Sequence, residues 1–92
     1  PVLGGDYVIE EKPYEAKSLG LYPVPSKDVI NIGELSAQSC EEVIIFDMTG
    51  RLMKHFKNDV NLNISDLSNG LYMIRVITDE GKSYTEKFVI SK

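Results

Sequence analysis

The chain has 92 residues, with 10 basic and 14 acidic side chains and a formal net charge of −4. An acidic chain repels phosphate backbones and anionic lipids, so we expect no nucleic-acid partner. The longest apolar run, Val43-Ile44-Ile45-Phe46, is far shorter than the roughly 20 residues of a membrane-spanning helix, so no membrane insertion is expected. The length suits one domain. Because the sequence begins at Pro1 without a signal-peptide pattern, we expect a piece of a longer protein.

Residues 1–20 carry scattered glycines and prolines among charged residues, which is typical of a linker. Within them only Tyr7-Val8-Ile9 resembles a strand, and we expect it to be an edge strand. Residues 21–92 alternate short β-branched or aromatic runs with turn residues. Strands are predicted at Val29–Ile32, Glu42–Met48, Arg51–Phe56, Val60–Ile64, Leu71–Thr78 and Ser83–Ile90. Their spacing of about ten residues predicts an all-β sandwich or barrel, and of the two we expect an antiparallel β-sandwich of about seven strands.

The turn residues and the alternation within the strands refine this fold. Thr49-Gly50 and Asp79-Glu80-Gly81 lie between strand-like runs and predict hairpins, because glycine supplies the positive φ that tight turns require. Asn69-Gly70 predicts a corner or a turn of helix before the next strand. The inward-facing apolar positions predict a core of Ile32, Ile45, Leu62, Ile64, Tyr72, Ile74, Val76, Phe88 and Ile90.

The run from Val43 to Phe46 is apolar on both faces of its strand. Two interpretations fit this pattern. Either the strand is ordinary core with partial exposure of one face, or its outer face is a docking or self-association surface, which would permit a homodimer.

A search for catalytic or ligand-binding residues finds no assembled site. The only histidine, His55, lies in a predicted strand without a neighbouring nucleophile or metal-ligand spacing. The only cysteine, Cys40, lies in a probable loop and is interpreted as an incidental thiol. Glycines are not clustered as in a phosphate-binding loop. The sequence therefore predicts neither an enzyme nor a cofactor or metal.

Four sequence blocks, taken in their order along the chain, do indicate a function. The first is Tyr22-Pro23-Val24-Pro25, leading to Ile30-Asn31-Ile32. The second runs from Val43 to Arg51 and contains Asp47 and Gly50. The third runs from Ile64 to Tyr72 and contains Gly70, and the fourth comprises Gly81 and the segment Lys87-Phe88-Val89-Ile90-Ser91-Lys92.

Together these blocks resemble the C-terminal sorting domain of cargo exported by the type IX secretion system of Bacteroidetes. The family usually has asparagine between the two prolines, where this chain has Val24. The motif residues are Tyr22, Pro23, Pro25, Asp47, Gly50, Arg51, Gly70, Tyr72, Gly81 and Phe88. The resemblance implies an immunoglobulin-like sandwich, in agreement with the strand pattern.

The resemblance also implies a role and partners. Residues 21–92 would be a non-catalytic signal on an upstream cargo domain of the same precursor, which passes through the periplasm to the cell surface or the medium. The outer-membrane type IX translocon would recognise the end of the chain, for which we expect contacts from Lys87, Ser91 and Lys92. A sortase-like peptidase would cut before Leu21, with Gly4-Gly5-Asp6 as the candidate region. The alternative interpretation is an immunoglobulin-like adhesion or carbohydrate-binding module.

Overall fold

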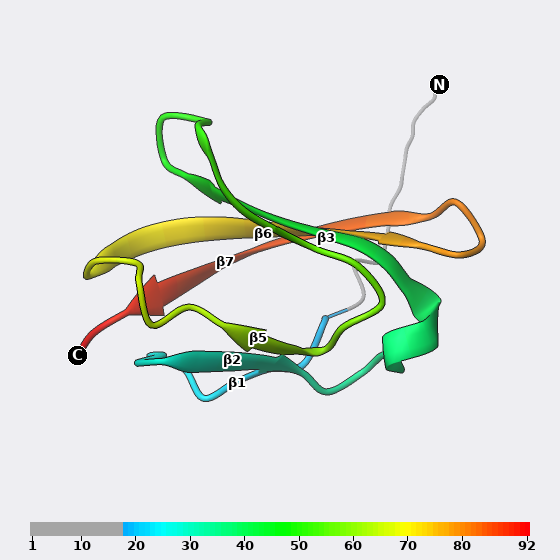
Figure 1. Cartoon of the computed structure of the whole chain (residues 1–92), viewed down its shortest axis with the longest axis horizontal. Coiled ribbons are helices and arrows are strands. Elements are labelled where there is room, and N and C mark those ends of the chain that lie inside the picture. Colours follow the sequence, from blue (N-terminus) through cyan, green and yellow to red (C-terminus); the bar gives the residue numbers. More distant parts are fainter. Residues whose placement is uncertain (1–17) are drawn as a thin grey trace, which may run out of the picture.

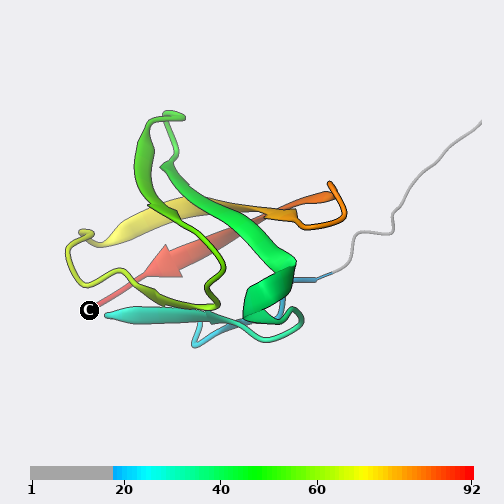
Figure 2. The same cartoon turned by 45° about the vertical axis from the view of Figure 1, so that its right-hand side comes forward.

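The computed structural model describes residues 18–92. They form two antiparallel sheets packed face to face (Figures 1 and 2). The smaller sheet has the strand order β1-β2-β5, and the larger has the order β4-β3-β6-β7. The strands are β1 (Leu21–Tyr22), β2 (Val29–Ile32), β3 (Cys40–Asp47), β4 (Leu52–Phe56), β5 (Asn61–Asn63), β6 (Gly70–Thr78) and β7 (Ser83–Ile90). This is the seven-stranded immunoglobulin-like sandwich predicted from the sequence.

Alternation along the strands builds the core between the sheets. In β6 the side chains of Tyr72, Ile74 and Val76 are buried, while the intervening residues face outward. The predicted core positions are all buried. The core also contains five residues that the prediction omitted, namely Leu19, Ile30, Cys40, Val43 and Leu67.

The placement of Cys40 corrects the prediction of a loop. Cys40 is the first residue of β3, and its side chain is fully buried in the core. A shift in the register of β3 against β6 between Cys40 and Glu42 lets Cys40 face the same side as Val43, three residues later. Simple period-two counting misses a strand start of this kind.

The connections follow the predicted turns. The β3–β4 and β6–β7 connections are hairpins, with Gly50 at φ +89° and Gly81 at φ +83°. A short 3₁₀ turn, Ala37–Ser39, leads into β3. The seventh strand is β1, whereas the predicted edge strand at Tyr7-Val8-Ile9 lies outside the described residues. Among residues 18–92 no helix has the length and apolar character needed to cross a membrane.

Candidate recognition surface

The sequence blocks that are far apart along the chain meet at one end of the sandwich. We call this the motif end and define it by residues 22–26, 47–51, 64–72 and 88–92. In Figure 1 it is the end marked C, where β6 begins and β7 finishes, with the β3–β4 hairpin projecting above it. Gly81 is the exception, because it lies in the β6–β7 turn at the opposite end.

The first block closes the side of the sandwich against the last strand. The backbone N–H of Ser26 donates to the carbonyl of Val89 at 2.8 Å, and the N–H of Ser91 donates to the carbonyl of Ser26 at 2.8 Å. The Ser26 hydroxyl is buried and donates to the carbonyl of Pro23 at 2.6 Å. Ser26 therefore joins the segment after β1 to the edge of β7 in a parallel bridge.

The third block holds the end of the chain through side chains. The Tyr72 hydroxyl donates to the carbonyl of Ser68 at 2.7 Å, four residues upstream, as in the tyrosine corner of immunoglobulin-like sandwiches. The Tyr72 ring also stacks on Phe88 of β7, with 5.9 Å between ring centroids.

Lys92 is fixed at two points. Its backbone N–H donates to the side-chain oxygen of Asn69 at 3.0 Å, and its ammonium group donates to the carbonyl of Ser65 at 2.7 Å. The end of the described chain therefore lies on the corner that precedes β6.

The second block makes a tight hairpin around one carboxylate. Oδ1 of Asp47 accepts the Thr49 hydroxyl at 2.6 Å, the Thr49 N–H at 2.9 Å and the Arg51 N–H at 3.0 Å. These bonds stabilise the charged carboxylate, so the pKa of Asp47 is lowered, first by the Thr49 hydroxyl and then by the Arg51 amide. The motif residues Asp47, Gly50 and Arg51 thus have a local role in shaping this turn.

The predicted contact residues Lys87, Ser91 and Lys92 differ in how far bonds within the fold already hold them in place. Lys87 projects from the outer face of β7, opposite Met73, and has no carboxylate within ion-pair distance among residues 18–92. Ser91 and Lys92 are exposed, but their backbone N–H groups are bonded to Ser26 and Asn69. The side chain of Lys87 is therefore exposed on the surface only, whereas Ser91 and Lys92 also stabilise the fold. The candidate cleavage region Gly4-Gly5-Asp6 lies outside the described residues.

Glu86 is an acidic residue on the inner, partly buried side of β7. In the structure its Oε1 accepts the backbone N–H of Leu19 at 2.9 Å. Leu19 is itself buried, and its carbonyl accepts the Glu34 N–H. The packed unit therefore includes Leu19, which the sequence pattern placed in the linker.

The outer face of the larger sheet is apolar near the hairpin. Val43 and Ile45 are core, whereas Ile44 and Phe46 on the other face are partly exposed, which fits both interpretations of this run. Phe46, Met73, Arg75 and Thr85 line a groove beside the β3–β4 turn, with a volume of about 360 Å³.

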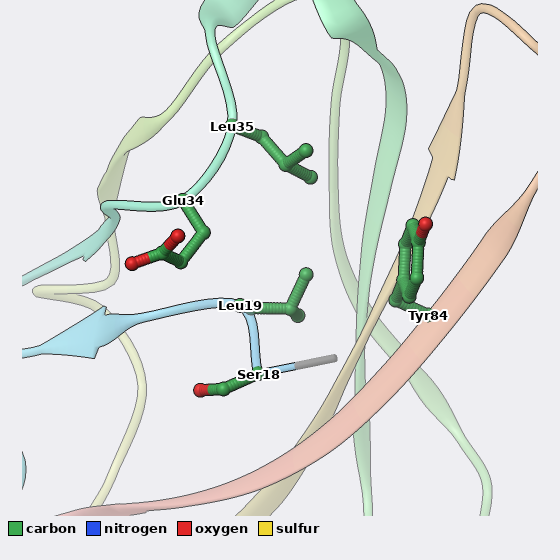
Figure 3. Close-up of a pocket in the computed structure, with 5 residues that line it drawn as sticks. All are labelled: Ser18, Leu19, Glu34, Leu35 and Tyr84. Carbon is green, nitrogen blue, oxygen red and sulfur yellow. The ribbon is translucent and has the colours of Figure 1, made fainter. Parts of the chain in front are cut away.

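A second depression lies where the described chain enters the fold. Leu19, Leu35 and Tyr84 point toward one another there, with Ser18 and Glu34 at its rim (Figure 3). Its volume of about 10 Å³ is close to that of a single water probe. It is a packing gap and not a ligand site.

The candidate reactive residues His55 and Cys40 lie apart from one another. His55 lies on β4 beside Glu42, with 3.4 Å between Nε2 and Oε1. Burial raises the pKa of the Cys40 thiol, and the charge of Asp59 raises it further, so the thiol is protonated and unreactive at neutral pH. Residues 18–92 contain no group of three or more histidine, cysteine or acidic side chains able to hold a metal ion.

Several residues of this surface were not found from the sequence. Ser26 is a small polar residue in a bend, and Asn69 was considered only as a turn former, so neither gives a periodic signal. The ion pair of Lys54 with Asp66, at 3.0 Å, connects β4 to the third block across 12 residues. No local pattern predicts such a pair.

Two comparisons with known proteins give matches. Residues 20–91 match the family described as "Secretion system C-terminal sorting domain". The chain is also 30% identical over 79 residues to Beta-agarase D of Zobellia galactanivorans. That match covers 83% of this chain but only 16% of the agarase, so the chain spans a small part of the length of this relative.

Proposed function

Because the chain belongs to the family of secretion system C-terminal sorting domains, we propose that the outer-membrane type IX translocon reads its motif end and that a sortase-like peptidase then removes it. Membership itself makes the chain a sorting signal for type IX secretion, which sends a larger cargo to the cell surface or the medium. In the proposed route the precursor crosses the periplasm before this domain is recognised.

The observation that carries this proposal is that the segment around Ser26 and the third block converge on the end of the last strand. Ser26, Asn69 and Ser65 all contact Ser91 or Lys92, although they are distant in sequence. A surface assembled in this way exists only in the folded domain. A translocon that recognises this surface therefore recognises only the folded domain. Its contacts would include the residues Lys87, Ser91 and Lys92.

An export assay tests this proposal. Residues 1–92 are fused to a periplasm-directed reporter in a type IX host, and surface reporter is measured for the intact chain, for Lys87→Ala and for deletion of Ser91 and Lys92. Lys57→Ala is the matched control, because Lys57 is an exposed lysine before β5, away from the motif end. We expect the intact chain and the control to export the reporter and the other two variants to export less. Normal export of both, with circular dichroism unchanged, would exclude these contacts.

The proposed cut lies upstream of the packed unit. A peptidase requires an extended and accessible backbone, whereas Leu19 is buried and hydrogen-bonded to Glu86. We therefore keep Gly4-Gly5-Asp6 as the candidate region. N-terminal sequencing of the released domain locates the bond, and a mature cargo that retains Leu71 to Lys92 would contradict removal of the domain.

The activity of the cargo is expected to reside outside this chain. The name of the relative is that of an agarase, and 84% of that protein (100% minus the 16% that the match covers) lies beyond the match. The alternative, a carbohydrate-binding module, is less well supported because such sites need aromatic platforms. Among residues 18–92 the only strongly exposed aromatic side chain is Tyr22.

A further inference from the structure

Among residues 18–92, the edge of β7 away from β6 has properties that the sorting role does not explain. β7 is the last strand of the larger sheet, so only one of its sides pairs with β6. The Val89 carbonyl and the Ser91 N–H point to the other side, where they bond Ser26. The register of β7 against β6 is continuous from Ser83 to Ile90. Because backbone groups of alternate residues face the same way, those of Thr85 and Lys87 also face this open side.

Ser26 covers only one end of this edge. Its bridge is isolated, and Tyr22, four residues earlier, is already paired with Asn31 in the other sheet. The residues between them cross from one sheet to the other and form no strand. Nothing else among residues 18–92 pairs with the edge at Thr85 or Lys87. The structure thus provides a place for one short additional strand.

The charge beside the edge indicates what kind of strand fits. The whole chain has a net charge of −4, yet the outward-facing residues of β6 and β7 include Arg75 and Lys87 and no acidic residue. Among residues 18–92 neither side chain has a carboxylate within ion-pair distance. The outward side of β6 and β7 thus carries basic and no acidic side chains, which complements an acidic partner.

The same charges argue against a second copy of this chain. An antiparallel pair of β7 strands would bring Lys87 of one copy close to the basic face of the other, and like charges across strands are destabilising. A lysine in the middle of an exposed edge is a common protection against such self-pairing. An acidic strand removes this penalty and gains an ion pair.

From these observations we propose that the edge of β7 at Thr85 and Lys87 is a strand-addition site for an extended, acidic segment of a protein of the export machinery. The partially exposed side chains of Leu71 and Val89, opposite each other on β6 and β7, offer apolar contacts to the same segment. Recognition through backbone hydrogen bonds tolerates variation of side chains. It therefore suits a sorting domain that is only 30% identical to the matched part of the agarase. The inference rests on the proposed function and states how Lys87 is contacted.

Hydrogen exchange on the isolated 92-residue chain tests whether the edge is free. The amides of Tyr84 and Glu86 face β6 and are expected to exchange slowly, whereas those of Thr85 and Lys87 exchange fast. Slow exchange of Thr85 and Lys87 would overturn the proposal, since the edge would then be covered already. If that protection grows with protein concentration and sedimentation shows a dimer, the occupant is a second copy.

Export of the reporter fusion tests whether the edge is used. Thr85→Pro removes an edge N–H without touching the ladder to β6, and Thr85→Ala is its control because it keeps the N–H. Lys87→Glu reverses the charge, and Lys87→Arg keeps it. We expect Thr85→Pro and Lys87→Glu to lower surface reporter by at least about fivefold, as the loss of one such interaction implies, while both controls export normally.

The outcomes separate the two proposals. If the intact chain exports the reporter and folded Lys87→Glu and Thr85→Pro do so equally well, strand addition is wrong and the sorting role stands. If the intact chain is not exported, the proposed function fails. Should Thr85→Pro unfold, the comparison of Lys87→Glu with Lys87→Arg decides alone.

Discussion

The two ends of the sandwich differ in how far side chains take part in joining their loops. At the motif end, the backbone bonds of Ser26 to Val89 and Ser91 are supplemented by side-chain bonds between loops, as in the bonds of Lys92 to Ser65 and Asn69. At the opposite end, comprising residues 36–40, 57–60 and 78–82, the loops are joined by backbone groups. There the Asn58 N–H donates to the Cys40 carbonyl and the Asp79 N–H donates to the Ser39 carbonyl.

This difference explains where a family motif concentrates. A bond between backbone groups is available to almost any residue, so it places little demand on the sequence. A bond that a tyrosine hydroxyl donates, or that an asparagine side-chain oxygen accepts, requires that residue. The recognisable blocks therefore gather where side chains hold the fold, and substitutions should affect the two ends unequally.

The largest effect is expected from Phe88→Ala. Phe88 is buried and stacked on Tyr72, so its removal should lower the free energy of unfolding by about 3–5 kcal/mol. The control is Val89→Ala, one residue later on the outer face, where the side chain is 40% exposed and a change of about 0.5 kcal/mol is expected. Urea denaturation measures both, and equal losses would contradict the assigned faces of β7.

Deletion of Ser91 and Lys92 should have the next largest effect. It removes their hydrogen bonds to Ser26, Asn69 and Ser65, and we expect a loss of about 1–2 kcal/mol. At the opposite end, Lys82→Ala removes only an exposed pair with Glu80 at 3.8 Å and should cost less than about 0.5 kcal/mol. Thermal unfolding compares the two, and an unchanged midpoint after the deletion would show that the end of the chain is not a structural clamp.

Tyr72→Phe tests a single hydroxyl. It leaves the buried ring in place but removes the bond to the Ser68 carbonyl, at an expected cost of about 1 kcal/mol. Tyr84→Phe is the control, because Tyr84 is only partly buried and its hydroxyl makes no hydrogen bond among residues 18–92. If the two variants are equally stable, the tyrosine corner contributes nothing here.

The smallest effect concerns the titration of Asp47. A carboxyl group ordinarily titrates near pH 3.9, and the bonds of Thr49 and Arg51 lower the pKa of Asp47. Because the folded-state pKa is the lower one, this carboxylate stabilises the hairpin above its unfolded-state pKa, and the contribution disappears as the pH falls through the folded-state value. Carboxyl NMR should place the midpoint below that of an unfolded peptide. Thr49→Val should raise it, and no change would refute the role of the hydroxyl.

The sequence predicts the strands well because their signal is local. Val29–Ile32 and Ser83–Ile90 have the predicted bounds, since alternation and flanking turn residues define both ends. Cys40 and Leu19 were missed because a register shift and an interaction with the distant Glu86 determine their burial. The connections between the loops of the motif end required the structure, since Lys92 contacts Asn69 and Ser65 across 23 and 27 positions of the sequence.

The central claim is that this folded chain is sufficient to direct type IX export. The most direct measurement is surface reporter fused to residues 1–92, compared between a type IX host and the same host with its translocon inactivated. We predict surface reporter in the first and retention in the periplasm in the second. Retention in both hosts, with the domain shown to be folded, would contradict the claim.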